Sequence, residues 1–423
     1  MVAGAGLAGI RTAEELRARG YQGRITLVGA EPYPPYDRPP LSKAFLAGKV
    51  DDTTLDSGAL SNTALGVELR LGETALGLGD EVLRTDRAEL GFDALVLATG
   101  SEPVAVPGDG PQHFLRTVDD ARRIRERLTP GTRLAVIGAG WIGAELATAA
   151  TARGCQVTVV EAASAPLSAA VSAEVGAATV PWYQAAGADL RLDTAVEAVT
   201  ADGVVLAGGE VLAADEIVTA VGIRPATAWL EGSGIKLDNG VAADEGLRTS
   251  VPGVFAVGDC AAFWSRRYSR RLRVEHWDNA LHAPEVAAAN LLGLNGGNGG
   301  DGQDGRGGRD GGGARDGGCA QDGGCAHDGA VYDPVPYFWS EQFGRMVQYV
   351  GWHPAGDRLL WRGDPSGDRW SACWLAGGTL AAVLTVDRPK DLVQARRVIA
   401  SGAAVDPDRL ADPGIPVRDA VQR

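Results

Sequence analysis

Two glycine motifs in this chain have the spacing that holds the diphosphate of a dinucleotide. In a G-x-G-x-x-G motif the first glycine turns the chain off a strand, the second lets backbone amides approach the diphosphate, and the third lets the next helix pack closely. The diphosphate then lies at the positive end of that helix. The glycines are Gly4, Gly6 and Gly9 in the first motif and Gly138, Gly140 and Gly143 in the second.

The neighbours of the second motif support this interpretation more strongly than its glycines alone. An apolar run at 134–137 precedes it, a helical pattern continues to Arg153, and a second apolar run at 157–160 ends at Glu161. That order predicts a complete βαβ unit, in which Glu161 accepts both hydroxyls of an adenosine ribose. A carboxylate there repels a 2′-phosphate, so Glu161 favours NAD over NADP. The alternative is a glycine-rich turn in another kind of α/β domain.

The first motif has the same order but a shortened beginning. A helical pattern runs to Arg19, a strand pattern covers 25–28, and Glu31 stands where the ribose acid belongs. Only three residues precede Gly4, whereas a buried strand normally needs about five residues to pair. We therefore expect most of the first strand to be missing, either because the true start lies upstream of Met1 or because a truncation weakens this site.

Together, the two motifs predict a flavin held by one unit and a nicotinamide cofactor visiting the other. Between the motifs, a proline-rich loop at 32–43 carries Arg38 and Lys43 to the carboxyl edge of a sheet, where ligands bind in this architecture. Arg38 is placed to meet phosphate oxygens and Lys43 to meet an electron-rich ring edge. A solvated surface position is the alternative for both, although the neighbouring prolines make the loop rigid.

Later strand ends add further residues that could face a ligand. A buried run at 95–97 closes on a tight turn, and a run at 254–257 ends in a glycine and an aspartate that can accept hydrogen bonds from ligand hydroxyls. An apolar helix is expected at 279–292 with Asp278 as its N-cap, so that its amide dipoles point at the ligand. The residues at these three places are Ala98, Thr99 and Gly100; Gly258 and Asp259; and Glu275, His276 and Trp277.

Composition bounds the class of protein. A hydrophobic content of 45% and a charged content of 22% are ordinary for a globular chain. The net charge of −14 and the pI near 4.9 argue against nucleic acid as the main partner. We find no apolar run long enough to span a bilayer and no cationic leader, and we expect a cytoplasmic protein. The five cysteines form neither a C-x-x-C pair nor a zinc-type quartet, so we expect reduced thiols.

One segment, 293–330, has a different composition from the rest of the chain. Gly, Asp and Arg dominate it, and it cannot bury enough apolar surface to offset the entropy of ordering, so we predict a disordered insertion. Cys319, Cys325 and His327 lie within it, but they are too few and too irregularly spaced to predict a metal site.

The expected fold class is α/β, with two Rossmann-like dinucleotide-binding domains and a C-terminal α+β domain. The first domain covers 1–108 and resumes at 239–292, around an inserted second domain at 109–238. Within the second domain we expect a helix at about 170–186. After the insertion at 293–330, residues 331–423 form the third domain, which opens with aromatic-rich strands.

The ordered motifs of the chain resemble one family closely. These motifs are GAGLAG, YDRPPLSK, LATGS, GAGWIGAE, VGIRP, VFAVGDC and PYFWSEQF. They are similar to the FAD-dependent NADH:ferredoxin reductases of oxygenase systems, the putidaredoxin reductase and biphenyl dioxygenase reductase type. The resemblance covers nearly the whole chain outside 293–330 and implies the glutathione-reductase-like fold, with FAD and NAD(H) as cofactors. The shortened first strand and the glycine-rich insertion depart from the family pattern.

The resemblance also implies roles for individual residues. Lys43 would lie beside flavin N5, paired with Glu145, and Trp339 would lie beside the flavin ring towards the electron acceptor; these three would be the catalytic residues. The FAD set would be Gly4, Gly6, Leu7, Ala8, Gly9, Glu31, Arg38, Lys43, Ala98, Thr99, Gly100, Gly258, Asp259, Glu275, His276, Trp277 and Trp339. The NAD set would be Gly138, Gly140, Trp141, Ile142, Gly143, Glu145, Glu161 and Gly222.

The implied reaction is hydride transfer from NADH to FAD, then single-electron transfer to a small acidic iron–sulfur ferredoxin that feeds a monooxygenase or ring dioxygenase. The region after the first ribose acid has no cysteine pair, so electrons must leave the flavin directly. Two alternatives stay open: an NADH oxidase that makes hydrogen peroxide, and an NAD-binding scaffold without flavin. The candidate ferredoxin-docking residues are Arg266, Arg267, Arg270, Arg271 and Arg273, with a solvated loop as the alternative.

Overall fold

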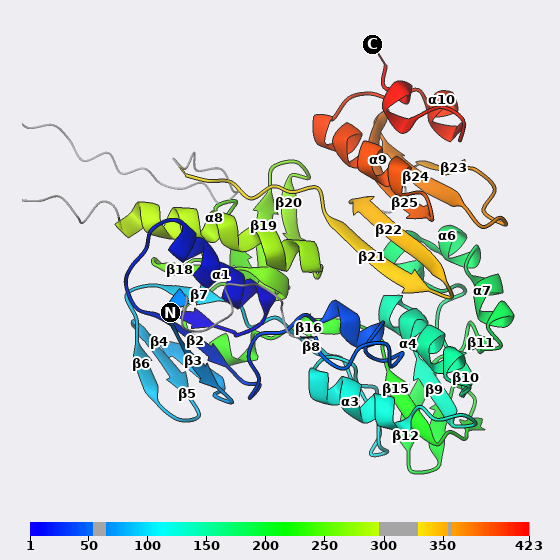
Figure 1. Cartoon of the computed structure of the whole chain (residues 1–423), viewed down its shortest axis with the longest axis horizontal. Coiled ribbons are helices and arrows are strands. Elements are labelled where there is room, and N and C mark those ends of the chain that lie inside the picture. The colour runs from blue at the N-terminus through cyan, green and yellow to red at the C-terminus, as the bar shows by residue number, and fades with distance from the viewer. Residues whose placement is uncertain (54–64, 296–328, 354–357, 423) are drawn as a thin grey trace, which may run out of the picture.

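The computed structural model describes residues 1–53, 65–295, 329–353 and 358–422 (Figure 1). Its first domain is built on a parallel sheet with the strand order β18-β7-β1-β2-β3. The strands are β1 (Val2–Ala3), β2 (Ile25–Gly29), β3 (Val67–Leu71), β7 (Leu95–Leu97) and β18 (Val254–Ala256). The strand β18 comes from a segment far down the chain, so the second domain is inserted within the first.

Helices α1 (Leu7–Ala18) and α8 (Trp277–Asn295) cover one face of this sheet, and their apolar side chains share its core. The strand β1 has two residues, yet it occupies the centre of the sheet: Val2 pairs with Leu27 on one side and with Val96 on the other. The predicted insertion lies outside the described residues, apart from the end of α8 and the two residues before 331.

Smaller sheets complete the first domain. One contains β4 (Ala75–Gly79), β5 (Val82–Thr85) and β6 (Glu89–Gly91), and another contains β17 (Val241–Ala243), β19 (Ala261–Ser265) and β20 (Arg270–Arg273). The strands β8 (Ser101–Pro103) and β16 (Ile223–Pro225) pair where the chain crosses between the first two domains. The prolines of the 32–43 loop form a short 3-10 helix, Pro39–Ser42, which fixes the positions of the residues on either side.

The second domain repeats the βαβ plan around the sheet β11-β10-β9-β15. Its elements are α3 (Val118–Arg127), β9 (Arg133–Ile137), α4 (Trp141–Ala152), β10 (Gln156–Val160), β11 (Asp189–Arg191) and β15 (Glu216–Thr219). A three-stranded antiparallel sheet is added by β12 (Val196–Thr200), β13 (Gly203–Leu206) and β14 (Val211–Leu212).

The prediction of one helix at about 170–186 is wrong. The structure has three short helices there, α5 (Ser168–Val171), α6 (Ala173–Ala177) and α7 (Val180–Ala185). Ser172 takes a φ of 85°, which no α-helical residue can have, and α7 starts afresh with a proline in its first turn.

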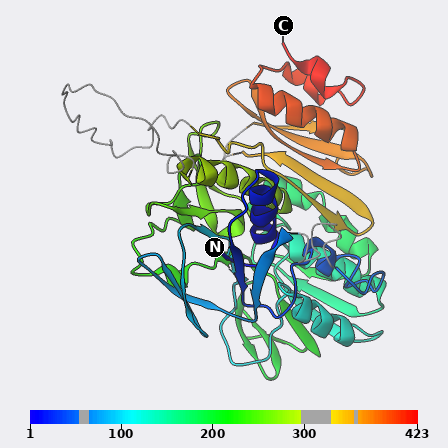
Figure 2. The ribbon, with the colours of Figure 1, turned by 60° about the vertical axis from the view of Figure 1, so that its left-hand side comes forward.

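The C-terminal domain is an antiparallel sheet in the order β21-β22-β25-β24-β23, covered by α9 (Pro389–Ser401) and α10 (Pro407–Ala411). Its strands are β21 (Tyr337–Gln342), β22 (Arg345–Gly351), β23 (Arg358–Arg362), β24 (Trp370–Ala376) and β25 (Thr379–Val386). Figures 1 and 2 show β21 and β22 reaching away from α9 towards α4 of the second domain. The predicted α/β class with two Rossmann-like domains and a separate C-terminal domain is confirmed. Within the described parts of the chain, no helix is both long and apolar enough to cross a membrane.

Candidate functional site

A cleft of about 1830 Å³ runs between the three domains, and nearly all the residues singled out from the sequence line it. From the first domain these are Gly4, Gly6, Leu7, Ala8, Glu31, Arg38, Lys43, Ala98, Thr99, Gly100, Gly258, Asp259, Glu275, His276 and Trp277. From the second they are Gly138, Gly140, Trp141, Ile142, Glu145, Glu161 and Gly222, and from the third Trp339. Two of the predicted residues, Gly9 and Gly143, lie beneath the cleft wall.

The two motifs use their glycines in the same way. A Cβ atom on Gly9 would lie 1.9 Å from the Gly4 carbonyl oxygen, and one on Gly143 would lie 2.0 Å from that of Gly138, so only glycine lets each helix pack so closely. A Cβ atom on Gly6 or on Gly140 would meet no atom within 4 Å, and their φ angles of −82° and −74° suit any residue.

The protein fold itself therefore does not require a glycine at either of those N-cap positions. The open space beside each one lies at a helix N-terminus, where backbone N–H groups and the helix dipole attract a diphosphate. Both positions thus fit the two dinucleotides that the motifs predict.

Around the first motif, the acid and the arginine of the sequence prediction bind each other. Glu31 forms an ion pair with Arg38 and also accepts a hydrogen bond from the Tyr36 hydroxyl. Burial is the main cause that raises the pKa of Tyr36, so this hydroxyl remains a donor at neutral pH. Arg38 lies at the cleft surface between Glu31 and the linker to the second domain, where it also donates to the Arg116 carbonyl oxygen.

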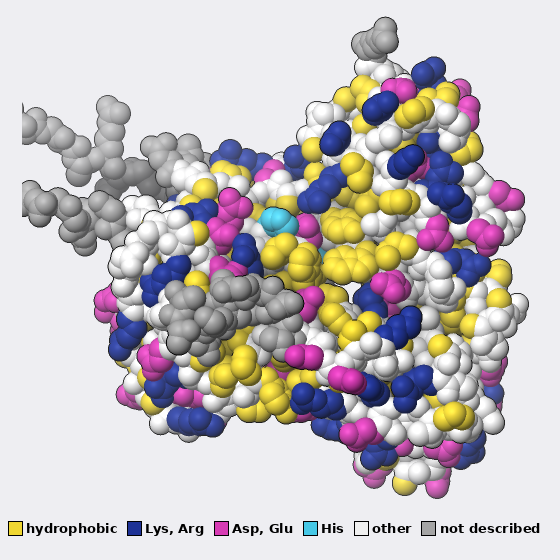
Figure 3. Space-filling model, in the orientation of Figure 1, with side chains coloured by type: hydrophobic (Ala, Val, Ile, Leu, Met, Phe, Trp, Pro, Cys, Tyr) yellow, Lys and Arg dark blue, Asp and Glu magenta, His cyan; other side chains and the backbone are white. Residues whose placement is uncertain are grey.

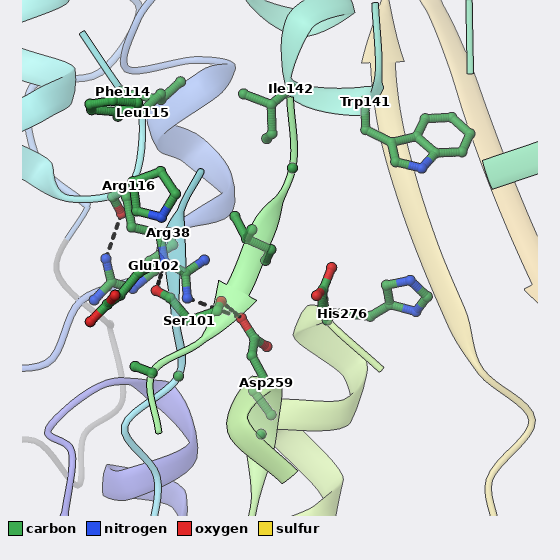
Figure 4. A pocket seen from close by; sticks show the side chains of 18 of the residues that line it. Arg38, Ser101, Glu102, Phe114, Leu115, Arg116, Trp141, Ile142, Asp259 and His276 are labelled. Carbon is green, nitrogen blue, oxygen red and sulfur yellow. Dashed lines mark hydrogen bonds and ion pairs between the residues drawn. The ribbon is translucent and has the colours of Figure 1, made fainter. Parts of the chain in front are cut away.

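Arg116 is a cleft residue that sequence reasoning missed. Its guanidinium donates to Asp259 at 3.0 Å and to the Ser101 carbonyl oxygen at 3.0 Å (Figure 4). Asp259 also accepts a hydrogen bond from the Ser101 hydroxyl at 2.9 Å. Arg116 stands in an irregular linker just before α3 and belongs to no motif, so the sequence contained no signal for it.

Lys43 and Glu145 meet as the family resemblance implies. The Lys43 Nζ lies 3.0 Å from Glu145 Oε2, and the Glu145 side chain is only 3% exposed. Two hydroxyls also bind this carboxylate: Ser42 donates to Oε2, and Ser340 donates to Oε1 at 2.6 Å. Each oxygen of this buried carboxylate therefore has at least one hydrogen-bond donor.

The Trp339 ring also lies near Lys43. The Lys43 Nζ is 6.0 Å from the centre of the Trp339 ring. The Trp277 ring meets Trp339 edge-on at 5.8 Å and donates its N–H to Asp37 at 2.7 Å. The lysine thus has a carboxylate and an indole as neighbours, in the cleft that both motifs line.

His276 forms part of an aromatic wall at the base of the cleft. Its ring packs 4.6 Å from Phe338, which in turn packs 4.5 Å from Trp141. Burial lowers the pKa of His276 to about 4, so the ring is neutral at physiological pH. Its Nδ1 atom is buried without a hydrogen-bond partner.

Glu161 lies beside the second motif as predicted. Its Oε2 accepts the Ala139 N–H at 2.7 Å, and its Oε1 accepts the Ala163 N–H at 2.9 Å. The carboxylate is thereby fixed at the end of β10, facing the cleft next to the glycine loop.

The helix start at Asp278 is a correction to the sequence prediction. The helix α8 already begins at Trp277, so Asp278 lies within its first turn and not at its N-cap. Asp278 instead pairs with Arg396 of α9 at 3.3 Å, which joins the first and third domains. In the described ranges no cluster of His, Cys, Asp and Glu could hold a metal, while Cys319, Cys325 and His327 lie outside them.

The arginine run does not form one surface. Arg266 pairs with Glu245, and Arg267 donates to the Ile399 and Ala400 carbonyl oxygens of α9. The other three, Arg270, Arg271 and Arg273, belong to β20 and line the cleft.

Comparisons with known proteins agree with this geometry. The sequence model of the pyridine nucleotide-disulphide oxidoreductases matches residues 1–283, and that of the reductase C-terminal domain matches 337–421. The chain is 34% identical to the ferredoxin–NAD(+) reductase component of an anthranilate 1,2-dioxygenase system from Burkholderia cepacia, over 98% of this chain and 97% of that one.

Two solved structures are similar over almost the whole chain. The crystal structure of Fdr9 has a TM-score of 0.87 and 46% identity and covers 98% of both chains. The covalent putidaredoxin reductase–putidaredoxin complex has a TM-score of 0.86 and 30% identity and covers 99% of this chain and 97% of that one.

Proposed function

Since the chain belongs to the pyridine nucleotide-disulphide oxidoreductases and is an NADH-dependent ferredoxin reductase of the dioxygenase and P450 electron-transfer type, we propose which of its residues perform each step. The family implies FAD and NAD(H) as cofactors. FAD supplies a carrier that accepts a hydride and releases electrons singly. The observation that supports the assignment best is the shared cleft, into which both glycine motifs and the Lys43–Glu145 pair open.

For FAD, the proposed site follows the first motif along the cleft. The α1 N-terminus would hold the diphosphate, with the cations Arg38 and Arg116 beside it. Glu31 would accept the ribose hydroxyls, and Asp259 would accept those of the ribityl chain. In the structure each carboxylate is paired with one of these arginines, so both charges are already compensated before a ligand enters.

The other members of the FAD set would complete the site. Ala98, Thr99 and Gly100 follow β7, Gly258 follows β18, and Glu275, His276 and Trp277 stand at the N-terminal end of α8. The neutral His276 ring lines the cleft beside them.

For NADH, the α4 N-terminus at Gly140 would hold the diphosphate, and Glu161 would accept the ribose hydroxyls. Trp141, Ile142 and Gly222 would border the path of the nicotinamide, since all three line the same cleft as Glu161 and Lys43. Lys43 would lie by the reacting edge of the flavin, where its charge stabilises the anionic reduced ring and Glu145 keeps that charge paired.

An anaerobic titration tests these assignments. The flavin absorbance of the purified protein should bleach with NADH at far lower concentration than with NADPH. Glu161→Gln should reduce that preference, because the charge that repels a 2′-phosphate is gone. The proposal fails if the protein takes up no FAD, or if Glu161→Gln discriminates as strongly as the original protein.

We further propose where the ferredoxin docks. Figure 3 shows hydrophobic side chains gathered in the hollow between the first and third domains. Arg270, which lines the cleft, lies 4.6 Å from the centre of the Trp352 ring, and Arg396 of α9 lies 5.8 Å from that of Tyr337 in β21. An apolar floor with arginines at its rim is suited to a small acidic partner, which such charges steer in weak electron-transfer encounters. Of the original five arginines, we retain Arg270, Arg271 and Arg273 for this face.

Replacement of two of these arginines tests the docking proposal. The double variant Arg270→Gln/Arg271→Gln should raise the ferredoxin Michaelis constant about threefold to tenfold at low salt and much less at about 0.5 M salt, where the charges are screened. Arg418→Gln removes an exposed arginine at the C-terminal end of the chain and serves as the control. An unchanged Michaelis constant at low salt would exclude this face.

A further inference from the structure

The Glu145 carboxylate is the point at which all three domains meet through hydrogen bonds. Glu145 belongs to α4 of the second domain, and Lys43 and Ser42 belong to the proline-rich loop of the first. Ser340 belongs to β21 of the third. The Ser340 side chain is fully buried, and its hydroxyl lies 2.6 Å from Glu145 Oε1.

The direction of this hydrogen bond follows from its neighbours. The Gln342 side-chain amide donates to the Ser340 oxygen at 3.1 Å, which leaves the hydroxyl hydrogen free to point at Glu145. A second hydrogen bond joins the end of β21 to α4 about one helical turn after Glu145, where the Phe343 N–H donates to the Thr148 hydroxyl at 2.9 Å. The end of β21 is thus fastened along α4 at two places.

Only one of the three donors to Glu145 is independent of the lysine loop. Ser42 and Lys43 are adjacent, so a shift of that loop moves both donors and carries Oε2 with them. Ser340 binds the other oxygen from a different domain. Both side chains of the ion pair have several rotatable bonds, so neither is fixed by its own backbone. The position of Lys43 Nζ therefore depends on the position of the Glu145 carboxylate, which Ser42 and Ser340 hold at its two oxygens.

We propose that Ser340 is a positioning residue: through Glu145, the C-terminal domain fixes Lys43 in the cleft and thereby sets the rate of hydride transfer from NADH. This inference rests on the roles proposed above for Lys43 and the cleft. The C-terminal domain would then act in the first half-reaction, which is reduction by NADH. Through Trp339 it would also act in the second half-reaction, which is electron transfer to ferredoxin.

The test separates the two half-reactions in the FAD-loaded protein. Stopped-flow bleaching by NADH should be about tenfold slower in Ser340→Ala and in Ser340→Cys, which keeps the volume but donates only weakly. Ser340→Thr keeps the hydroxyl and should restore most of the rate. Reoxidation of the reduced protein by ferredoxin should change less than twofold in all three variants.

A control separates positioning from a loss of structure. Ser371 of β24 is equally buried in the same sheet and contacts a carboxylate, that of Asp391, away from the cleft. Ser371→Ala should leave the bleaching rate unchanged and should shift the urea unfolding midpoint at least as much as Ser340→Ala does. The visible spectrum of the bound flavin, which reports the charges beside the ring, should change with Ser340→Ala and not with Ser371→Ala.

Two results would overturn the inference. One is bleaching of Ser340→Ala and Ser340→Cys within twofold of the original protein. The other is an equal slowing of both half-reactions, which a general loss of structure would cause. If instead the original protein does not bleach with NADH, the proposed function fails, whatever Ser340 does.

Discussion

Removal of one partner from the buried Lys43–Glu145 pair should cost far more stability than removal of one partner from an exposed pair. At an effective dielectric constant of about 20, unit charges separated by the observed 3.0 Å attract by about 5–6 kcal/mol. Desolvation offsets part of this energy. The Lys43 and Glu145 side chains are only 12% and 3% exposed, so either charge left without its partner would be buried and unpaired. Removal of one partner from such a pair costs about 3–5 kcal/mol.

A double-mutant cycle measures this effect. Lys43→Met and Glu145→Met should each lower the apparent free energy of unfolding in urea by about 3 kcal/mol or more, while the double variant should lose at least about 2 kcal/mol less than their sum. The control is Arg133–Asp215, a pair at 2.6 Å whose side chains are 51% and 46% exposed, for which the same cycle should give a coupling below about 1 kcal/mol. Additivity of the Lys43 and Glu145 variants within about 0.5 kcal/mol would refute the reasoning.

Other variants test the glycine loop and the half-buried His276. Gly140→Ala places a methyl group in the open space proposed for the diphosphate, so the urea unfolding midpoint should stay unchanged while the NADH Michaelis constant rises tenfold or more. The methyl group of Gly143→Ala would collide with the Gly138 carbonyl oxygen, so this variant should instead lower the midpoint. Because the pKa of His276 is lowered to about 4, the unfolded chain takes up its proton first as the pH falls below about 6.5. Stability should therefore fall between pH 6.5 and pH 4 by up to about 1.4 kcal/mol per unit, and less steeply in His276→Gln. The exposed His282→Gln is the control, and equal pH slopes in the original protein and His276→Gln would contradict the assignment.

The sequence was sufficient wherever a residue's position depends on its immediate neighbours in the chain. A residue at the carboxyl end of a parallel strand faces the ligand side of the sheet, so Glu31, Asp259 and Glu161 could be placed in the cleft from strand patterns alone. The family resemblance then paired Lys43 with Glu145, two residues that no local pattern connects.

Other predictions failed because a local detail overrode a general pattern. The helix expected at about 170–186 is interrupted at Ser172, which has a positive φ. Nothing in the local sequence indicates that φ. The arginine run looked like one charged surface, but its first two members lie in the turn before β20 and its last three lie in β20 itself. Arg266 therefore reaches Glu245 while Arg270 reaches the cleft. Arg116 was missed because it lies in a linker with no pattern of its own.

The position of Ser340 depends on the register of one hairpin. Trp339 and Ser340 are consecutive in β21 and so point to opposite faces, one towards Lys43 and the other to Glu145. A slip of one residue against β22 would exchange them and press an indole against the buried carboxylate.

The turn after β21 prevents that slip. Phe343 and Gly344 form a two-residue hairpin loop with φ angles of 49° and 78°, a conformation that fixes which residues pair. A bulky aromatic residue rarely takes a positive φ, and here the surroundings hold it: its N–H binds Thr148 of α4 and its ring packs 4.7 Å from Tyr183. The second domain therefore determines the register of β21, and β21 in turn brings Ser340 to Glu145 of that same domain.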